Sequence, residues 1–174
     1  MSTPLTFRLA QTVGIFGAAW LSGNIAALSM NAAPGILESR RENEISSTIL
    51  AKQWKKLYEA GKAQNPPIAA ITAAAFFYLA WSVRSGRSLV RGASNLPTLY
   101  GSAAVLTLSI VPYTIVAMSK TNAALLTKAT GNSKVAEKAS ADVDELVQNW
   151  ISLNTIRGLL PLVGGLVGIF AALP

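Results

Sequence analysis

Four long apolar stretches alternate with polar segments along the 174 residues of this chain. They cover about residues 7–30, 66–83, 96–118 and 156–173. Each approaches the roughly 20 residues that a helix needs to cross the hydrocarbon core of a bilayer. Lone strands are excluded, because every backbone polar group inside lipid must find a partner within the protein. The pattern predicts four transmembrane helices, and Pro112 predicts a kink in the third helix near Tyr113.

The two long connections between these stretches each contain a predicted helix. In the first connection, residues 44–60 carry apolar side chains at helical spacing among charges, and Gly61 is expected to end the helix. In the second, Asp142 and Asp144 lie near the start of a helix that runs into the fourth span, where acids favourably oppose the helix dipole. The expected fold is all-α: an integral membrane four-helix bundle, a single domain over residues 1–174, with extra interfacial helices in the long connections.

Small residues recur at helical spacing in two of the predicted spans. The first span contains Gly14, Ala18, Ser22 and Ala26, each four residues apart. Gly164 and Gly168 repeat the spacing in the fourth span. Small residues at this spacing let helix backbones approach closely in lipid, so we interpret them as packing seams. They are also compatible with a homo-oligomer.

Composition and charge favour lipid over nucleic acid as the main environment. Charged residues make up 13% of the chain, whereas about 25% is typical of soluble domains. The net charge is +7, but the basic residues lie between apolar blocks, where phospholipid headgroups would meet them. The first apolar stretch is longer than the core of a signal peptide, so it is interpreted as an uncleaved span. Counts of Lys and Arg place the two long connections in the cytoplasm.

The absence of Cys and His removes many kinds of chemistry. It excludes disulfides, iron–sulfur clusters, Cys nucleophiles, serine–histidine triads and imidazole-ligated metals. The eight acids all lie in the two long connections. A site made of carboxylates alone stays open, but we expect no tightly bound transition metal.

Polar and aromatic residues gather at the span ends that adjoin the long connections. The candidates are Asn31, Trp54, Tyr58, Asn65, Tyr113, Thr121, Asn122, Trp150, Asn154 and Arg157. Trp150, Asn154 and Arg157 stand at i, i+4 and i+7, and so share one helical stripe. Arg157 is the most informative, because a cation inside an apolar span is costly without a polar partner or a function. We hypothesise that these residues line a cavity at the membrane boundary.

Each candidate also has a simpler interpretation. Trp and Tyr side chains often anchor helices at the membrane interface. Arg157 could extend its guanidinium to the headgroups, and Asn122 could cap a helix end.

In these residues and their spacing, the chain resembles the anthrone oxygenase family, which consists of small four-helix membrane proteins of polyketide pathways. The resemblance covers most of the chain. The matching residues are Gly17, Ser22 and Pro34; Trp54, Tyr58, Gly61 and Pro66; the segment 118–122 with Leu125; and Trp150, Asn154, Arg157 and Pro161.

The resemblance implies a monooxygenase that uses O2 to convert an anthrone, an aromatic polyketide, into an anthraquinone without flavin, haem or metal. It also implies a multi-pass protein in an endomembrane of a fungal cell. In a mechanism built on this resemblance, Trp54 and Trp150 stack the substrate rings. Arg157 stabilises the developing negative oxygen, with Asn122 and Asn154 donating hydrogen bonds. Further substrate contacts are assigned to Asn31, Asn65, Thr121 and Tyr113. The base is Tyr58 or a water held by Asn65 or Asn154.

Two other functions remain as alternatives. The first is a non-enzymatic scaffold or assembly subunit, which the small-residue seams support. The second is a small transporter or channel. No acid lies in a predicted span, no internal repeat is found, and no selectivity filter is recognisable, so this second alternative is the weaker one.

Overall fold

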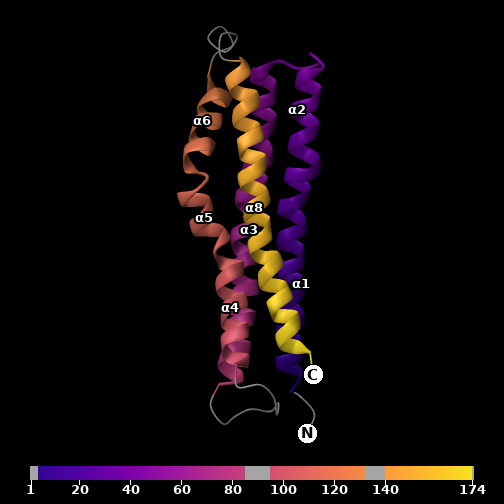
Figure 1. Ribbon diagram of the computed structural model, residues 1–174, viewed down its shortest axis with the longest axis vertical. Helices are drawn as coiled ribbons and strands as arrows, with labels where there is room; N and C mark the ends of the chain where they lie inside the picture. Colours follow the sequence, from indigo (N-terminus) through magenta and orange to yellow (C-terminus); the bar gives the residue numbers. More distant parts are fainter. Residues whose placement is uncertain (1–3, 85–94, 132–139, 174) are drawn as a thin grey trace. The chain divides into compact units, whose positions relative to one another are not determined.

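The computed structural model describes residues 4–84, 95–131 and 140–173, and every regular element within them is helical. The elements are α1 (Leu5–Ala27), the π-helical turn η1 (Leu28–Ala32), α2 (Ala33–Arg41), α3 (Ser47–Ser82), α4 (Leu96–Leu108), α5 (Ile110–Val116), α6 (Ser119–Thr130) and α8 (Ser140–Ala172), as Figure 1 shows. This confirms the all-α prediction.

Among the described residues, three helical segments are long and apolar enough to cross a membrane: Leu5–Arg41, Leu96–Val116 and Asp142–Ala172. They contain the predicted first, third and fourth spans, apart from a residue or two at their ends. The predicted second span falls in α3, which is not among these three segments. Large apolar side chains point outward along these helices, with Phe16 71% exposed and Phe170 66% exposed. Such a surface suits lipid rather than water, so a membrane protein is supported.

The prediction that Gly61 ends a helix is wrong, because α3 runs without interruption from Ser47 to Ser82. A glycine in a helix interior costs about 1 kcal/mol relative to alanine, which the burial of neighbouring side chains such as Trp54 outweighs. Pro66 and Pro67 also lie inside α3. The connecting helix and the predicted second span are therefore one element.

A short turn sets the start of α3. Asn43 has a φ of 62°, a conformation that Asn tolerates better than most residues. It lets the amide of Glu44 donate to the carbonyl of Ser39 at 3.0 Å, which closes the end of α2. The hydroxyl of Ser46 then accepts a hydrogen bond from the Ile49 amide at 3.3 Å. The helix predicted from residue 44 consequently begins three residues later.

The predicted third span is interrupted, as Pro112 suggested, but the break is at Ser109, between α4 and α5. Proline at position 112 cannot donate to the carbonyl of Leu108, four residues earlier, and its ring crowds that carbonyl. The Ser109 hydroxyl donates to the carbonyl of Leu106 at 2.6 Å. The kink is thus confirmed, and it lies one helical turn before Tyr113.

The chain divides into two compact units. The first unit comprises residues 1–23, 65–111 and 158–174, and the second comprises residues 24–64 and 112–157.

The core of the first unit is built around the ring of Phe76, which is fully buried. A Cβ added at Gly14 would lie 2.7 Å from this ring, and one added at Gly168 would lie 2.5 Å from it. Only a hydrogen in place of a side chain therefore allows both helices to contact the ring. The hydroxyl of Tyr100 accepts a hydrogen bond from Gln11 at 2.9 Å and donates to the Ala171 carbonyl at 3.2 Å. The predicted packing seams are supported at these two glycines.

We expect Gly14→Ala to destabilise the protein. The new methyl group would collide with the buried Phe76 ring, and overpacking of this kind typically lowers the free energy of unfolding by about 1–3 kcal/mol. Gly23→Ala, in the same helix, is the matched control because nothing lies within 4 Å of its added Cβ. It should be neutral or slightly stabilising. Unfolding in detergent, followed by circular dichroism, measures both; equal stabilities would contradict the packing argument.

Candidate active site

The core of the second unit is built around two indole rings. Trp54 and Trp150 are buried, and their ring centroids lie 5.9 Å apart at an interplanar angle of 87°. Tyr58, one turn after Trp54 on α3, stacks on it at 5.2 Å and 14°. The two indoles contact each other rather than facing an open space. Tyr58, which is half-buried, is therefore the member of this aromatic cluster best placed to meet a guest molecule.

Arg157 is buried, with 8% of its surface exposed. Its Nη1 donates to the hydroxyl of Thr114 on α5 at 3.1 Å. The phenol groups of Tyr58 and Tyr113 lie within electrostatic range of the guanidinium. The ion pairs found among the described residues are Arg40–Asp144, Lys55–Glu59 and Lys128–Asp142. None of them includes Arg157, so this buried cation has no carboxylate partner within the described part of the chain.

Asn154 is fully buried, and its two amide hydrogens are both engaged. Its Nδ2 donates to the carbonyl of Ile25 at 3.1 Å and to the hydroxyl of Ser29 at 2.6 Å. A carbonyl can only accept, so this contact fixes which end of the amide faces Ile25. The expectation that Asn154 donates to a substrate does not match this geometry. Its Oδ1 is the available group, and it can only accept.

The two partners of Asn154 lie at the junction of α1 and the π-helical turn η1: Ile25 is in the last turn of α1, and Ser29 is in η1. Pro34 lacks an N–H and crowds the carbonyl of Met30, four residues earlier. Widening the preceding turn relieves this crowding, and the Ala33 amide bonds to the carbonyl of Leu28, five residues back. Turns of this kind are frequent at functional sites. Sequence reasoning missed Ser29, although a proline shortly after a serine in an apolar span was the available signal.

Seven buried polar atoms of the second unit have no hydrogen-bond partner among the described residues. Two of them, Arg40 Nε and Asp144 Oδ1, face each other in an ion pair at 3.8 Å, and the other five have no such partner. These five are Trp54 Nε1, Trp150 Nε1, Asn122 Oδ1, Asn154 Oδ1 and Arg157 Nε. Native proteins rarely leave buried donors or acceptors unpaired, and each such atom points to a water or a ligand. Three are donors and two are acceptors. Together with the unpartnered charge of Arg157, they define the candidate active site.

The remaining predicted site residues differ in their placement. Thr121 is buried and accepts a hydrogen bond from Asn149 at 3.2 Å. Tyr113 is half-buried and packs against the second unit's core. Asn31 is exposed, and the structure does not bring it to the cluster, because the widened turn η1 changes the register of the residues after it. Asn65 is buried and belongs to the first unit.

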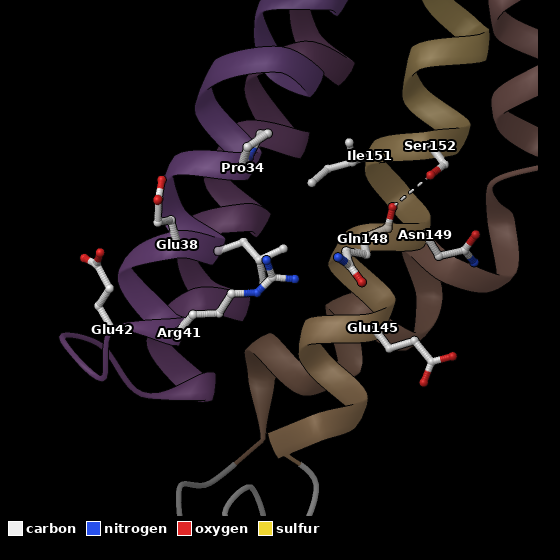
Figure 2. Close-up of a pocket in the computed structure, with 10 residues that line it drawn as sticks. Pro34, Glu38, Arg41, Glu42, Glu145, Gln148, Asn149, Ile151 and Ser152 are labelled. Carbon is white, nitrogen blue, oxygen red and sulfur yellow. Dashed lines mark hydrogen bonds between the residues drawn. The ribbon is translucent and has the colours of Figure 1, made fainter.

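A pocket of about 910 Å³ lies on another face of the second unit, between α2 and α8 (Figure 2). None of the ten predicted site residues lines it. It is therefore a separate feature from the cluster around Arg157.

The fold and the site together define a helical membrane protein with a buried cation, aromatic rings and unpaired polar atoms gathered in one unit. A family model described as anthrone oxygenase matches residues 54–167, which include every predicted site residue except Asn31. The chain belongs to the anthrone oxygenase family. This confirms the resemblance noted from the sequence.

Several curated relatives match nearly the whole chain. Anthrone oxygenase encC of Aspergillus fumigatus is 38% identical over 95% of this chain and 93% of its own length. An anthrone oxygenase of Claviceps purpurea is 30% identical over 91% of this chain and 85% of its own length. A noranthrone monooxygenase of Aspergillus flavus is 30% identical over 91% of this chain and 71% of its own length. No solved structure matches this chain.

We expect Asn154→Leu to destabilise the second unit. It removes two buried hydrogen bonds and should lower the free energy of unfolding by about 2 kcal/mol. Thr155→Val is the matched control, because Thr155 is exposed and its hydroxyl bonds only to the preceding turn. That change should stay within about 0.5 kcal/mol of the wild type. Chemical unfolding in detergent is the measurement, and an Asn154→Leu protein as stable as the wild type would refute the bonding scheme.

Proposed function

We propose that this protein oxidises an anthrone to an anthraquinone with O2, as a monooxygenase of fungal polyketide biosynthesis. One observation carries the proposal: Arg157 is buried, and no described carboxylate pairs with it. A buried cation without a protein counter-ion suits a reaction in which a bound aromatic molecule becomes negatively charged. The names of the fungal relatives supply the chemical class of that molecule.

The chemistry needs little from the protein beyond charge stabilisation. The methylene of an anthrone is acidic, because loss of its proton leaves an aromatic phenolate. That anion passes one electron to O2, and the carbon radical and superoxide combine into a peroxide. Uptake of a proton gives a hydroperoxide, which loses water to give the quinone. One oxygen atom enters the product, the other leaves as water, and O2 takes up all four electrons.

Each polar atom of the cluster can act in one step of this reaction. Arg157 stabilises the phenolate oxygen, and its unpaired Nε is one donor for it. The indole N–H groups of Trp54 and Trp150 supply two further donors. The Oδ1 atoms of Asn122 and Asn154 accept hydrogen bonds from substrate hydroxyls or from a water. Tyr58, which lies within electrostatic range of Arg157, takes the proton from the methylene in its phenolate form and later gives this proton to the peroxide.

The proposed reaction requires no resident cofactor, because O2 is the only oxidant in the balance. The lack of Cys and His leaves the chain without the common ligands of haem, iron–sulfur clusters and zinc.

We place the protein in a fungal endomembrane. Three helical segments of the described residues are suited to cross a bilayer, and an apolar substrate and O2 both partition into lipid. The fungal source of the relatives motivates the choice of host.

Arg157→Met tests the role of the buried charge. We expect a loss of about 10²- to 10³-fold in quinone formation above the autoxidation rate, because the oxyanion loses its cation. Thermal stability should stay equal or rise, because an unpaired buried charge is replaced by an apolar chain of similar length. The assay follows quinone absorbance with purified protein, an anthrone and air. Normal turnover by Arg157→Met would exclude the oxyanion role, and an inert wild-type protein would favour the scaffold alternative.

Tyr58→Phe tests the proposed base. Removing a general base typically costs about 10²-fold in rate or more, so kcat should fall while the ring stacking on Trp54 is kept. Tyr78→Phe is the control, because Tyr78 is exposed and belongs to the first unit. The kcat at saturating anthrone is compared among the three proteins. An unchanged kcat for Tyr58→Phe would assign the proton transfer to a water.

A further inference from the structure

The guanidinium of Arg157 is held by a residue that was not among the predicted site residues. Thr114 lies on α5, and its hydroxyl accepts the hydrogen bond that Arg157 Nη1 donates at 3.1 Å. Arginine has no acceptor atom, so the direction of this bond is fixed. The bond joins two residues 43 positions apart in the sequence and connects α5 to α8 inside the second unit.

The nitrogen that Thr114 binds determines which edge of the guanidinium is left for a guest. Nη1 is the terminal nitrogen on the same side as Cδ, whereas Nε and Nη2 share the other edge of this planar group. Nε is buried and has no hydrogen-bond partner among the described residues. Charge-assisted hydrogen bonds from such an edge to a negative oxygen are among the strong ones in proteins. Thr114 therefore binds the guanidinium at a nitrogen outside this edge.

Arg157 needs a contact of this kind because its side chain is long and flexible. It lies at the start of the apolar stretch 156–173, where an arginine can extend its charge toward the headgroups. Only 8% of its surface is nevertheless exposed. No described carboxylate pairs with it. The Thr114 hydroxyl is a polar contact that keeps the charge inside the protein.

The surroundings of Thr114 strengthen its bond to Arg157. Thr114 is half-buried, and it belongs to the segment that begins after the helix break at Ser109. The two residues that follow it, Ile115 and Val116, are 66% and 80% exposed, which suits contact with lipid. Where water is scarce, a hydrogen bond to a charged group is stronger than it is in water.

We propose that Thr114 is a positioning residue of the active site: it holds Arg157 so that the Nε edge faces the substrate oxygen on which negative charge develops. Thr114 itself does not touch the substrate and acts on the reaction through Arg157. A hydroxyl suits this task better than a carboxylate, because it accepts a hydrogen bond without neutralising the charge that the reaction uses. This inference rests on the proposed oxidation, since it assigns how the catalytic cation of that reaction is oriented.

Thr114→Val tests the positioning role, because valine keeps the branched shape and removes the acceptor. With purified protein, an anthrone and air, we expect kcat to fall about 10- to 100-fold and KM to stay within about twofold of the wild type, because the lost interaction belongs to the transition state. Thr114→Ser keeps the hydroxyl and should turn over at a rate close to the wild type. Thr127→Val is the matched control, since the Thr127 hydroxyl is exposed and donates to the Ala123 carbonyl of its own helix.

A double variant separates positioning from a purely structural role. If Thr114 acts through Arg157, adding Thr114→Val to Arg157→Met causes no further loss of kcat, so the two effects are not additive. A structural role would instead lower kcat by the same factor in both backgrounds. Circular dichroism establishes that each variant folds. If Thr114→Val does not fold, Thr114→Ala takes its place, because it removes the acceptor and introduces no new atom.

Three results would overturn the proposal while leaving the proposed function intact, because the wild-type protein turns over in each. Thr114→Val with the wild-type kcat would show that Arg157 keeps its orientation without the hydroxyl. The same loss of kcat in the wild-type and Arg157→Met backgrounds would make Thr114 a structural residue. A raised KM with an unchanged kcat would make it a substrate-binding residue. A wild-type protein that forms no quinone would overturn the proposed function together with the positioning role.

Discussion

The burial of Arg157 is the constraint on which the second unit depends. An ionised guanidinium taken out of water needs hydrogen-bond acceptors and compensating charge. Within the described residues the guanidinium donates a hydrogen bond to the Thr114 hydroxyl, and the phenols of Tyr58 and Tyr113 lie within electrostatic range. Charge compensation by a carboxylate is missing among these residues. A protein that tolerates this arrangement gains the ability to stabilise negative charge on a bound molecule, which is the property that the proposed oxidation uses.

Prolines explain how backbone groups become available around this cation. Pro34 widens the preceding turn into η1, whose Ser29 hydroxyl accepts a hydrogen bond from Asn154 beside the Ile25 carbonyl at the end of α1. Pro112 breaks the helix at Ser109 and lets α5 begin as a separate segment that carries Thr114. In both places the helix departs from regular geometry close to a hydroxyl that contacts Asn154 or Arg157.

The sequence predicted which candidate residues are neighbours along one helix better than which helices they join. Helical spacing correctly placed Trp54 beside Tyr58, and it placed Trp150, Asn154 and Arg157 on one buried stripe. It did not reveal that the two indoles pack against each other, because that contact joins residues 96 positions apart. Asn31 was included from its position alone, and the register change at η1 turns it outward. The helix end predicted at Gly61 was wrong because the low helix propensity of one glycine costs less free energy than the packing of the whole helix α3 contributes.

The locked amide of Asn154 makes the site chemically asymmetric. With both hydrogens engaged, this residue contributes only an acceptor, and the unpaired oxygen of Asn122 adds a second one. The unpaired nitrogens of Trp54, Trp150 and Arg157 are all donors. A purely hydrocarbon guest would leave all five atoms unpaired, at a cost of about 1–3 kcal/mol for each. A guest with both an electron-rich oxygen and hydroxyl groups can satisfy the two kinds of atom at once, and a hydroxylated anthrone has this combination.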